Sequence, residues 1–424
     1  MVKRIVIAGS CRTPVGKFNG RLKNVEAHQL LADCFRETIS RTQIRMQDIN
    51  SAVAATCINS PKAMNVARVS VLMAALPEEV ANNYRGRYLT EDEARSTSAI
   101  HIPAFTAHRN CGSGVQAIVS AVQEIKDEDS GSEVILVGGT ESMSNSPMIL
   151  ARGSAGYKMR DAVLMDSLFW GLKDPLTGQL MGLNSENTVN KWGISREDQD
   201  KFALRSHRRA YDAIVSGKFE SQIVPVKSIE KGTFGDIREK TIFEDEGPID
   251  PDKISVVELA SLKPYFKKGG TITAANSSSL NDGAASCLVM SYERAQELGI
   301  IPEAEIISYS VAACDPSYMG EGPILAIPKA LKRAGLSACD LSCVEVNEAF
   351  ASIALAAQRN FEFSDEVFNI HGGAVSLGHP IAATGMILLV KAINILKDMQ
   401  KDFGLISLCI GGGQGIALVI KRFV

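Results

Sequence analysis

Cys111 is the residue of this chain whose type and setting best suit nucleophilic catalysis. It lies between a predicted strand and a predicted helix, flanked by Gly112 and Gly114. A cysteine at a helix N-terminus gains from the helix dipole and from unpaired backbone N–H groups, so we expect a lowered pKa and an available thiolate. The glycines would let a substrate approach those N–H groups closely. Position alone leaves a small buried core residue as an equal alternative.

A histidine and a second cysteine lie in loops that could supply acid–base chemistry to such a thiol. His379 stands between Gly378 and Pro380 ahead of an apolar helix, where it could act as a base. Its one rival among the six histidines is His371. Cys409 lies in LCIGGGQGIALVI, which reads as a tight hairpin of two buried strands with a glycine-rich turn. Taken alone, each of these residues fits a structural role better.

Asn347, in the string VEVNEAFAS, follows a short apolar strand and is expected to begin a helix. Its side chain could cap that helix, which is a common use of asparagine. Alternatively, it could hold a water molecule against a carbonyl oxygen.

The elements around these residues alternate between short apolar runs and amphipathic helices, which indicates an α/β fold. In the first 140 residues the pattern predicts strands at 2–9, 52–56, 101–107 and 133–139, and helices at 25–40, 63–75 and after residue 114. The polar, charge-rich stretch 78–100 reads as an inserted surface segment.

The C-terminal region repeats the layout around Cys111. GHPIAATG (378–385) precedes an apolar helix (386–396), a polar loop and the strand LISLCIGG (405–412). In both copies a small-residue turn leads into a helix, and a glycine pair ends the next strand. The repeat predicts a duplicated α/β half.

Between the two copies, residues 141–279 are more polar, and we interpret them as a lobe inserted into the first half. The lobe contains a predicted helix at 195–214, with Ser195 as its N-cap and Asp198 three positions later. Ser, Gly and Thr are dense at 269–286, which suits backbone contact with a ligand.

The overall composition argues against several classes of protein. A chain of 424 residues fits two or three domains, and its formal charge of −3 favours neither nucleic acid nor an anionic membrane. The nine cysteines are scattered without a CxxC pair, which suits a reducing compartment and gives no metal-ligand cluster. We find no signal peptide, membrane-spanning stretch or peroxisomal ending, so we expect a cytoplasmic location.

Taken together, the motifs resemble the thiolases in order and spacing over nearly the whole chain, apart from the segment near 78–100. The matching strings are NCGSG (110–114), GGTESMSNSP (138–147), MGLNSEN (181–187), GTITAANSSSLNDGAA (270–285), NEAF (347–350), GGAVSLGHP (372–380) and CIGGGQG (409–415). The resemblance implies two α/β halves in α-β-α-β-α layers with an inserted loop lobe. The boundaries expected are 1–140 plus 280–302 for the first half, 141–279 for a coenzyme A-binding loop domain, and 303–424 for the second half.

The same resemblance implies a role for each candidate residue. Cys111 would be the acylated nucleophile and His379 its base. Cys409 would move a proton on or off the α-carbon of the acetyl group. Asn347 and His379, with a bound water, would form one oxyanion site, and the backbone N–H groups of Cys111 and Gly411 would form the other.

Coenzyme A is, by this resemblance, a substrate, and neither a resident cofactor nor a metal is implied. Ser278 and Leu280 would lie along its pantetheine arm, and Met181, Ala349 and Phe350 would contribute to substrate binding. The implied reaction cleaves a 3-ketoacyl-CoA to acetyl-CoA and acyl-CoA, or condenses two acetyl-CoA molecules, by a ping-pong Claisen mechanism. A homodimer or homotetramer is expected, with no nucleic-acid partner and no membrane insertion.

Departures from the family pattern leave the acyl chain length open. Leu180 precedes Met181, where many acetoacetyl-CoA-forming members carry a histidine. TAANSSS stands in place of the common TAGNASG, and IAATG in place of IGASG.

Three other interpretations compete with the thiolase. A ketoacyl-synthase-type condensing enzyme would use a pair of histidines where this chain has His379 and Cys409. A silent scaffold would have lost a nucleophile or base, although an active subunit of a β-oxidation complex is compatible with the sequence. A nucleotide-binding protein would carry GxGxxG after the first strand, where this chain reads AGSCRTP.

Overall fold

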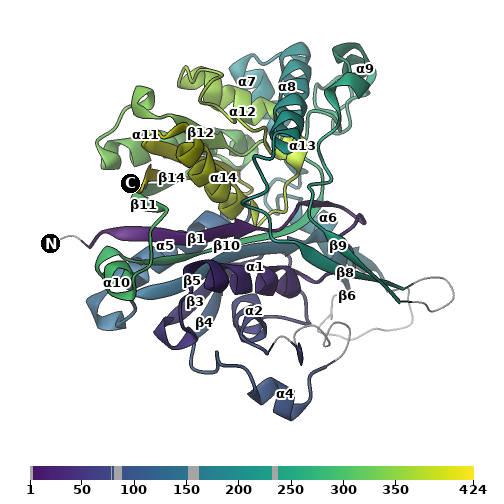
Figure 1. Ribbon diagram of the computed structural model, residues 1–424. Helices are drawn as coiled ribbons and strands as arrows, with labels where there is room; N and C mark the ends of the chain where they lie inside the picture. Colours follow the sequence, from purple (N-terminus) through teal and green to yellow (C-terminus); the bar gives the residue numbers. More distant parts are fainter. Residues whose placement is uncertain (1–2, 78, 81–87, 151–161, 232–236) are drawn as a thin grey trace.

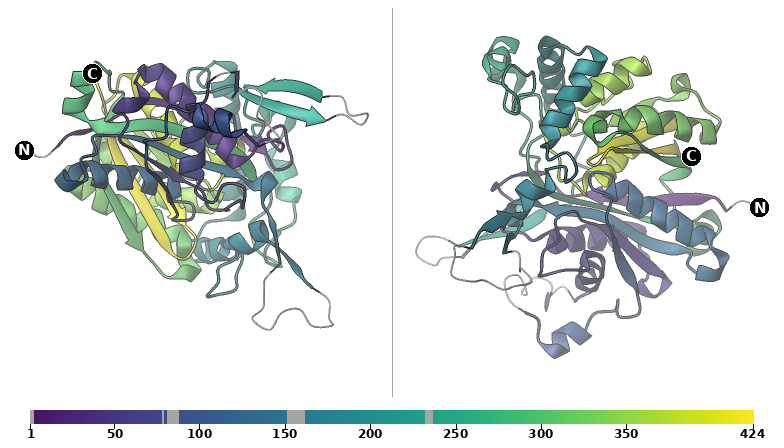
Figure 2. Two further views of the ribbon diagram at one scale, coloured as in Figure 1. Left: turned by 90° about the horizontal axis from the view of Figure 1, so that it is seen from below. Right: turned by 180° about the vertical axis from the view of Figure 1, so that it is seen from behind.

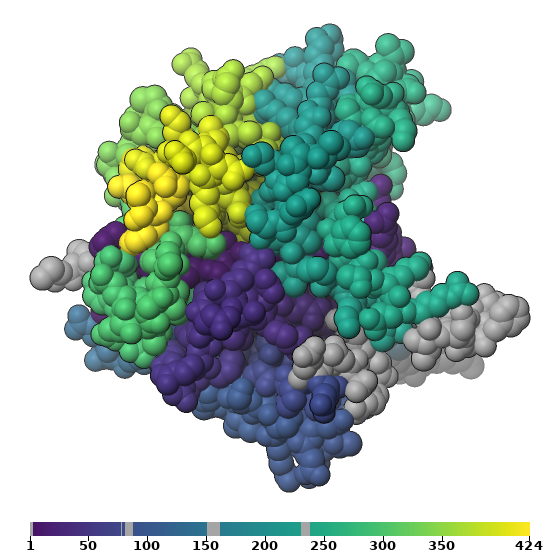
Figure 3. Space-filling model, viewed as in Figure 1, coloured from purple at the N-terminus to yellow at the C-terminus, as the bar shows by residue number. Residues whose placement is uncertain are grey.

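The computed structural model describes residues 3–77, 79–80, 88–150, 162–231 and 237–424. The fold is α/β, with a first half and a second half stacked on one another and a lobe of helices and hairpins at one end (Figure 1). The space-filling view shows this lobe in contact with both halves (Figure 3).

The first half contributes five long strands to a mixed sheet. In spatial order they are β1 (Ile5–Arg12), β10 (Asn281–Ser291), β5 (Val134–Ser142), β3 (Ser51–Ala55) and β4 (Ala104–Ala107), with the short β2 (Gly16–Lys17) paired to β10. The pairings β1–β10 and β10–β5 are antiparallel, whereas β5–β3 and β3–β4 are parallel.

The second half repeats this arrangement. Its strands are β11 (Ala304–Ala313), β14 (Gln414–Arg422), β13 (Phe403–Ile410) and β12 (Cys343–Val346). The first two pairings are antiparallel and the third is parallel, as in β1, β10, β5 and β3. The predicted duplication is therefore confirmed at the level of strand order and direction.

Helices cover both faces of the two sheet regions, so most strands read as continuous apolar runs. Along β1, Ile5 and Ile7 face a core shared by the two halves, while Val6 and Ala8 face an outer core. The shared core contains α5 (Ser113–Lys126) and α14 (Thr384–Met399).

The outer layers consist of two helices on each half. They are α1 (Ala27–Thr42) and α2 (Val66–Ala74) on the first half, and α11 (Gly322–Ala334) and α12 (Ala351–Asn360) on the second. Between the halves, β1 and β11 share only a short ladder, Val6 with Glu305 and Ile7 with Ala304. The α-β-α-β-α layering is confirmed.

The lobe between β5 and β10 is built from four α-helices, of which α8 has 20 residues, and two hairpins in the residues that the structure describes. Its elements are β6 (Met148–Leu150), β7 (Leu164–Asp166), α6 (Ser167–Gly171), α7 (Met181–Trp192), α8 (Arg196–Val215), β8 (Val226–Lys231), β9 (Ile237–Ile242) and α9 (Val256–Ser261). The hairpins β6–β7 and β8–β9 project from the same end of the molecule (Figure 2). The predicted N-cap Ser195 is confirmed for α8, and it bonds reciprocally with Asp198 as a capping box.

A buried ion pair fastens the lobe to the first strand. The guanidinium of Arg12 donates to both carboxylate oxygens of Asp245, at 2.8 and 2.9 Å, and both side chains are fully buried. The guanidinium also lies over the ring of Phe219, 4.9 Å from its centroid. Removing one partner would leave an unpaired buried charge, at a cost of about 3–5 kcal/mol, so the pair fixes where the lobe meets β1.

One predicted segment lies partly outside the described residues, and one predicted role needs correction. Residues 78 and 81–87 of the predicted insertion lie outside the described residues, and the remainder includes the helix α4 (Glu91–Arg95). Asn347 does not cap a helix, because α12 begins at Ala351 with Phe350 in the N-cap position. The backbone stays extended there, and Phe350 forms a bridge with Ser277.

Two short helices complete the path of the chain, α10 (Tyr292–Leu298) after β10 and α13 (Ala374–Leu377) ahead of His379. Within the described ranges, no helix is long and apolar enough to cross a membrane.

Candidate active site

The N-termini of α5 and α14 meet inside the shared core, and glycines make this possible. A Cβ on Gly114 would lie 2.8 Å from the carbonyl oxygen of Ala382, and a Cβ on Gly385 would lie 2.9 Å from the backbone nitrogen of Val115. Contacts this short are not tolerated, so any larger residue would push the helices apart. The turn before α5 and the loop before α14 are thereby brought together at two positive helix ends.

Cys111 lies in the turn before α5, and its sulfur faces backbone N–H groups. The N–H groups of Gly411 and of Cys111 itself lower the pKa of the thiol, but burial outweighs them and raises that pKa to about 11. The lowered pKa expected from the sequence is therefore wrong for this state. The free energy lost when a thiolate is removed from water exceeds the stabilisation that the two N–H groups give it. The thiol is neutral at pH 7 and needs a base.

Hydrogen bonds around Cys111 fix the turn to the hairpin that follows Cys409. Asn110, which has a positive φ of 43°, donates from Nδ2 to the carbonyl oxygen of Gly411 at 2.9 Å. The Ser113 hydroxyl closes the turn by accepting from the backbone N–H of Arg109 at 2.7 Å. The N–H of Gly411 is thus held beside the sulfur.

His379 is buried, and its neighbours fix both its position and its tautomer. Its backbone N–H donates to Asn281 Oδ1 at 2.9 Å. The Thr384 hydroxyl donates to the carbonyl of Pro380 at 2.9 Å and lies 2.5 Å from His379 Nδ1. We assign the imidazole proton to Nδ1, which then donates to the Thr384 oxygen, while the Thr384 hydroxyl donates to Pro380 and Nε2 is the acceptor nitrogen of the ring. Burial lowers the pKa of His379 to about 4, so the ring is neutral at pH 7 and can accept a proton.

Asn347 lies beside the imidazole and is fully buried. Its Nδ2 is 3.4 Å from His379 Nε2, and its backbone N–H donates to Ser407. Its Oδ1 is buried without a hydrogen-bond partner among the described residues. A buried polar atom left unpaired in this way costs about 1–3 kcal/mol and is typical of a site that binds a polar ligand.

Cys409 lies at the end of β13, in the hairpin that the sequence predicted, and is almost completely buried. Burial, and next the nearby Cys111, raise the pKa of its thiol. Met181, Ala349 and Phe350 pack with it in one apolar cluster. Three of the residues expected to bind substrate are therefore gathered around the second thiol.

The glycine turn after Cys409 has a backbone that other residues would strain. Gly412 and Gly413 have φ values of 87° and 76°. A Cβ on Gly413 would also lie 2.5 Å from the carbonyl oxygen of Cys314. The turn can therefore direct the Gly411 N–H towards Cys111 only with this sequence.

The two residues expected along the pantetheine arm lie near these clusters. The N–H of Ser278 donates to the carbonyl of Ala349 at 3.0 Å. Leu280 packs in an apolar cluster with Cys111, Ile381 and Met143.

Sequence reasoning did not assign roles to three residues whose side chains contact the His379 loop: Asn281, Thr384 and Glu141, the last by accepting from the backbone N–H of Ala382. All three lie within strings that were noted for other reasons. The five-residue separation of His379 and Thr384 spans a loop and the first turn of a helix, which was the one available signal for their contact. For the other two, the partners are distant in sequence.

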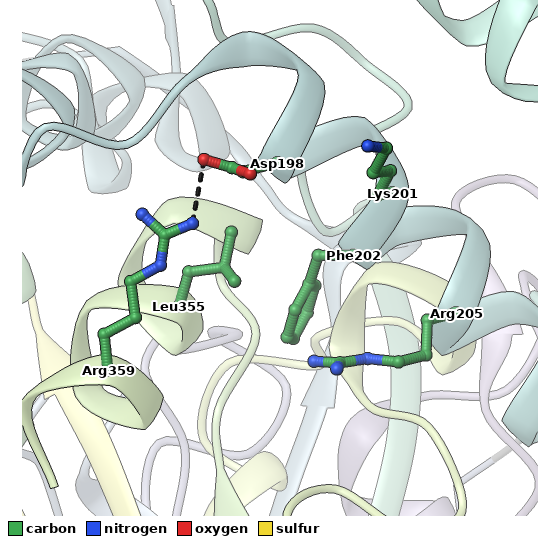
Figure 4. Close-up of a pocket in the computed structure, with 6 residues that line it drawn as sticks. All are labelled: Asp198, Lys201, Phe202, Arg205, Leu355 and Arg359. Carbon is green, nitrogen blue, oxygen red and sulfur yellow. Dashed lines mark ion pairs between the residues drawn. The ribbon is translucent and has the colours of Figure 1, made fainter. Parts of the chain in front are cut away.

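A pocket of about 220 Å³ lies elsewhere, between α8 and α12 (Figure 4). It is lined by Asp198, Lys201, Phe202, Arg205, Leu355 and Arg359. Its three basic side chains already have acidic partners: Lys201 with Glu197, Arg205 with Asp365, and Arg359 with Asp198. Its apolar residues belong to a core cluster distinct from those around the two thiols. The pocket is therefore a poor candidate for phosphate binding.

In the part of the chain that the structure describes, no group of three or more His, Cys, Asp or Glu side chains is placed to hold a metal ion. All nine cysteines are free thiols.

Comparison with known proteins gives full-length matches. The sequence signature of the thiolase N-terminal domain matches residues 5–293, and that of the thiolase C-terminal domain matches residues 300–422. An acetyl-CoA acetyltransferase of Syntrophomonas wolfei is 40% identical over 426 residues, covering 99% of this chain and 100% of the relative. A probable acetyl-CoA acyltransferase of Staphylococcus aureus is 39% identical over 421 residues and covers 99% of both chains.

Solved structures agree with these relatives. The Bacillus anthracis acetyl-CoA acetyltransferase has a TM-score of 0.89 at 37% identity, covering 100% of this chain and 99% of its own. Human mitochondrial 3-ketoacyl-CoA thiolase, solved in complex with CoA, has a TM-score of 0.88 at 34% identity, covering 100% of this chain and 98% of its own. With both domain signatures and full-length relatives in agreement, this chain belongs to the thiolase family.

Proposed function

We propose that this protein is an acyltransferase of the thiolase type. It transfers an acyl group between Cys111 and coenzyme A, cleaving a 3-ketoacyl-CoA to acetyl-CoA and acyl-CoA or condensing two acetyl-CoA molecules. The observation that carries the proposal is the meeting of the Cys111 turn, the His379–Asn347 pair and the Cys409 hairpin at two helix N-termini.

In the cleavage direction, the sulfur of Cys111 attacks the 3-keto carbon while His379 Nε2 accepts the thiol proton. The pKa of the thiol is about 11 and that of the imidazole about 4, so transfer before attack would be strongly uphill. The proton therefore moves as the C–S bond forms. The neutral imidazole with its proton on Nδ1 is the form of the base that this step needs.

The attack produces an oxyanion on the former ketone. The backbone N–H groups of Cys111 and Gly411 are the donors we assign to it, since both already face the sulfur. The C2–C3 bond then breaks, leaving an acyl thioester on Cys111 and an enolate of acetyl-CoA. The Cys409 thiol, kept protonated by burial, donates its proton to the α-carbon of that enolate.

A second half-reaction releases the acyl group. The proton held by His379 first passes to the Cys409 thiolate, which restores the neutral imidazole and the Cys409 thiol. Coenzyme A then enters, and His379 accepts its thiol proton as its sulfur attacks the acyl thioester. When the tetrahedral intermediate collapses to acyl-CoA, that proton returns to the sulfur of Cys111. Asn347 would contribute to binding the thioester oxygen through a water molecule, and its unpaired buried Oδ1 supports such a polar contact. Condensation runs through the same steps in reverse.

We assign the nucleotide end of coenzyme A to the lobe 141–279, with Ser278, Leu280 and Met181 nearer the thiols. The CoA-bound human relative supports coenzyme A as a substrate. We place the enzyme in fatty acid and lipid metabolism and in the cytoplasm. The Cys409 hairpin favours this thiolase over a ketoacyl synthase, which would carry a second histidine there.

We also propose a homodimer or homotetramer. β4 is the last strand of the sheet among the described residues, and Phe105 within it is 43% exposed. An edge strand of this kind is commonly covered by another element or a second copy. Light scattering that gives the mass of a monomer, 45.6 kDa, would contradict the assembly.

The test of the reaction is thiolysis of acetoacetyl-CoA and of a long-chain 3-ketoacyl-CoA by wild type and by Cys111→Ala. We expect wild type to cleave at least one substrate and the variant to lose about 10⁴-fold or more in rate. The ratio of the two wild-type rates gives the chain-length preference. If wild type binds coenzyme A and cleaves neither substrate, the proposed function is wrong.

A further inference from the structure

A buried carboxylate joins the two loops that carry the nucleophile and the base. Glu141, on β5, is fully buried, and four donors face its two oxygens. Oε1 accepts from the Thr56 hydroxyl at 3.1 Å and the Ile58 N–H at 3.0 Å. Oε2 accepts from the N–H groups of Cys57 and Ala382, both at 3.1 Å. Burial raises the pKa of the Glu141 carboxyl, and these four donors oppose that rise. All four contacts can be donor to oxygen, which is the pattern of an ionised carboxylate, and we assign that state to Glu141.

One side of this carboxylate supports the nucleophile. The loop 56–58 follows β3, and the Cys57 thiol donates to the carbonyl oxygen of Asn110 at 3.1 Å. The same sulfur lies 3.5 Å from the Ser113 hydroxyl. The residues on both sides of Cys111 are therefore braced by a loop that Glu141 holds.

The other side supports the base. Ala382 lies three residues after His379, in the same loop, and its carbonyl oxygen faces Gly114 at the start of α5. The carboxylate thus contacts both elements at the point where the two helix ends meet.

We propose that Glu141 is a positioning residue that sets the relative placement of Cys111 and His379, acting through the loops 56–58 and 379–384. The inference rests on the proposed function, in which the thiol must pass its proton to the imidazole during attack. An error of about 1 Å in such an arrangement can cost roughly 100-fold in rate.

The charge of Glu141 gives a readout that separates this role from general support of the fold. The carboxylate raises the pKa of the Cys111 thiol, in addition to the larger effect of burial. Its removal should therefore move the pH dependence of Cys111 alkylation to lower pH.

Two variants separate the effect of the length of the Glu141 side chain from the effect of its charge. Glu141→Gln keeps the length of the side chain but places an amide NH₂ against backbone donors and removes the charge. Glu141→Asp keeps the charge but is one methylene too short to reach both loops. We expect each to lower kcat for 3-ketoacyl-CoA thiolysis about 10- to 100-fold with KM changed less than about threefold. Only the glutamine variant should shift the alkylation curve, measured with iodoacetamide by mass spectrometry of the Cys111 peptide.

Glu348→Gln is the matched control. Glu348 is also buried and accepts from Ser206, Asn369 and Val375, but none of its partners belongs to the loop 56–58. Losing this charge should leave the Cys111 alkylation curve at the wild-type pH.

Wild-type kcat in the folded Glu141→Asp variant would overturn the proposal, as would an unshifted alkylation curve in Glu141→Gln. If neither variant folds by circular dichroism, Thr56→Val removes a single donor from the carboxylate, and wild-type kcat there would overturn it. Failure of wild type to cleave any 3-ketoacyl-CoA would instead refute the proposed function, while the alkylation assay would still report on Glu141.

Discussion

The two turns that meet at the centre of this molecule have the same place in the duplicated fold but hold their reactive groups differently. The sulfur of Cys111 is approached by backbone N–H groups, whereas two side chains anchor His379: Asn281 accepts from its backbone N–H, and Thr384 contacts Nδ1 of its imidazole. Backbone N–H groups that are already in place can stabilise an oxyanion while it exists next to the sulfur. Side-chain anchors fix a tautomer. The duplicated scaffold supplies two helix ends, and the anchoring of each end decides its chemical role.

The largest loss of rate is expected when the Cys409 thiol is removed and the Cys111 thiol is kept. Cys409→Ser should lower C–C cleavage of a 3-ketoacyl-CoA about 10²- to 10⁴-fold, because the enolate loses its proton donor. Acyl exchange between acyl-CoA and labelled coenzyme A needs only Cys111 and His379, and should persist. Equal loss of both rates would show that Cys409 is not specific to the carbon–carbon step.

The side-chain anchoring of the base can be broken by one isosteric change. Thr384→Val removes the hydroxyl that accepts from Nδ1, so the imidazole loses its fixed tautomer. We expect kcat to fall about 10- to 100-fold with a small change in KM. Thr384→Ser keeps the hydroxyl and should retain most activity. A fully active Thr384→Val variant would show that His379 does not need the Thr384 hydroxyl to act as the base.

The close approach of the two helix ends can be tested from either side. Gly114→Ala and Gly385→Ala each place a Cβ within 3.0 Å of backbone atoms, so each should lower the free energy of unfolding by about 1–3 kcal/mol. Gly171→Ala is the control, because nothing lies within 4 Å of a Cβ there. Urea denaturation of the three variants measures the difference. Equal free energies of unfolding for all three variants would mean that α5 and α14 can move apart without loss of stability.

The smallest effect is expected from pH. His379 loses its function as a base only when pH falls through its pKa of about 4, and the Cys111 thiol ionises only near pH 11. The rate constant kcat/KM should therefore change little between about pH 6 and 9. An acid limb centred near 6.5, the ordinary pKa of histidine, would mean that His379 is more exposed to solvent in the working enzyme.

Much of the fold was predictable because its signals are local. Continuous apolar strands, the capping box at Ser195 and the repeated turn–helix–strand pattern each depend on neighbouring residues. The order of strands in each half depends on pairing between distant residues, which the sequence does not show directly. The internal repeat nevertheless predicted that the two halves have the same arrangement.

The site was predictable in its residue types but not in its electrostatics. The sequence places Cys111 at a helix N-terminus, which favours a low pKa, but it cannot reveal how far the surrounding chain removes the sulfur of this partly exposed residue from water. The sequence allowed Asn347 to cap a helix, but the backbone is still extended at Phe350 and the helix begins only at Ala351. Glu141 and Asn281 act on residues far along the chain, and a single sequence contains no sign of those contacts.

The short ladder between β1 and β11 has a consequence for how the molecule can come apart. Only two register pairs join the strands of the two halves, whereas α5 and α14 are buried in a core that draws residues from both. A chain cut between 298 and 303 would therefore leave each fragment with a bare apolar helix face. Each fragment could cover that face only with the other half or with a second copy of itself, so the two pieces should reassemble when mixed and aggregate or self-pair when kept apart.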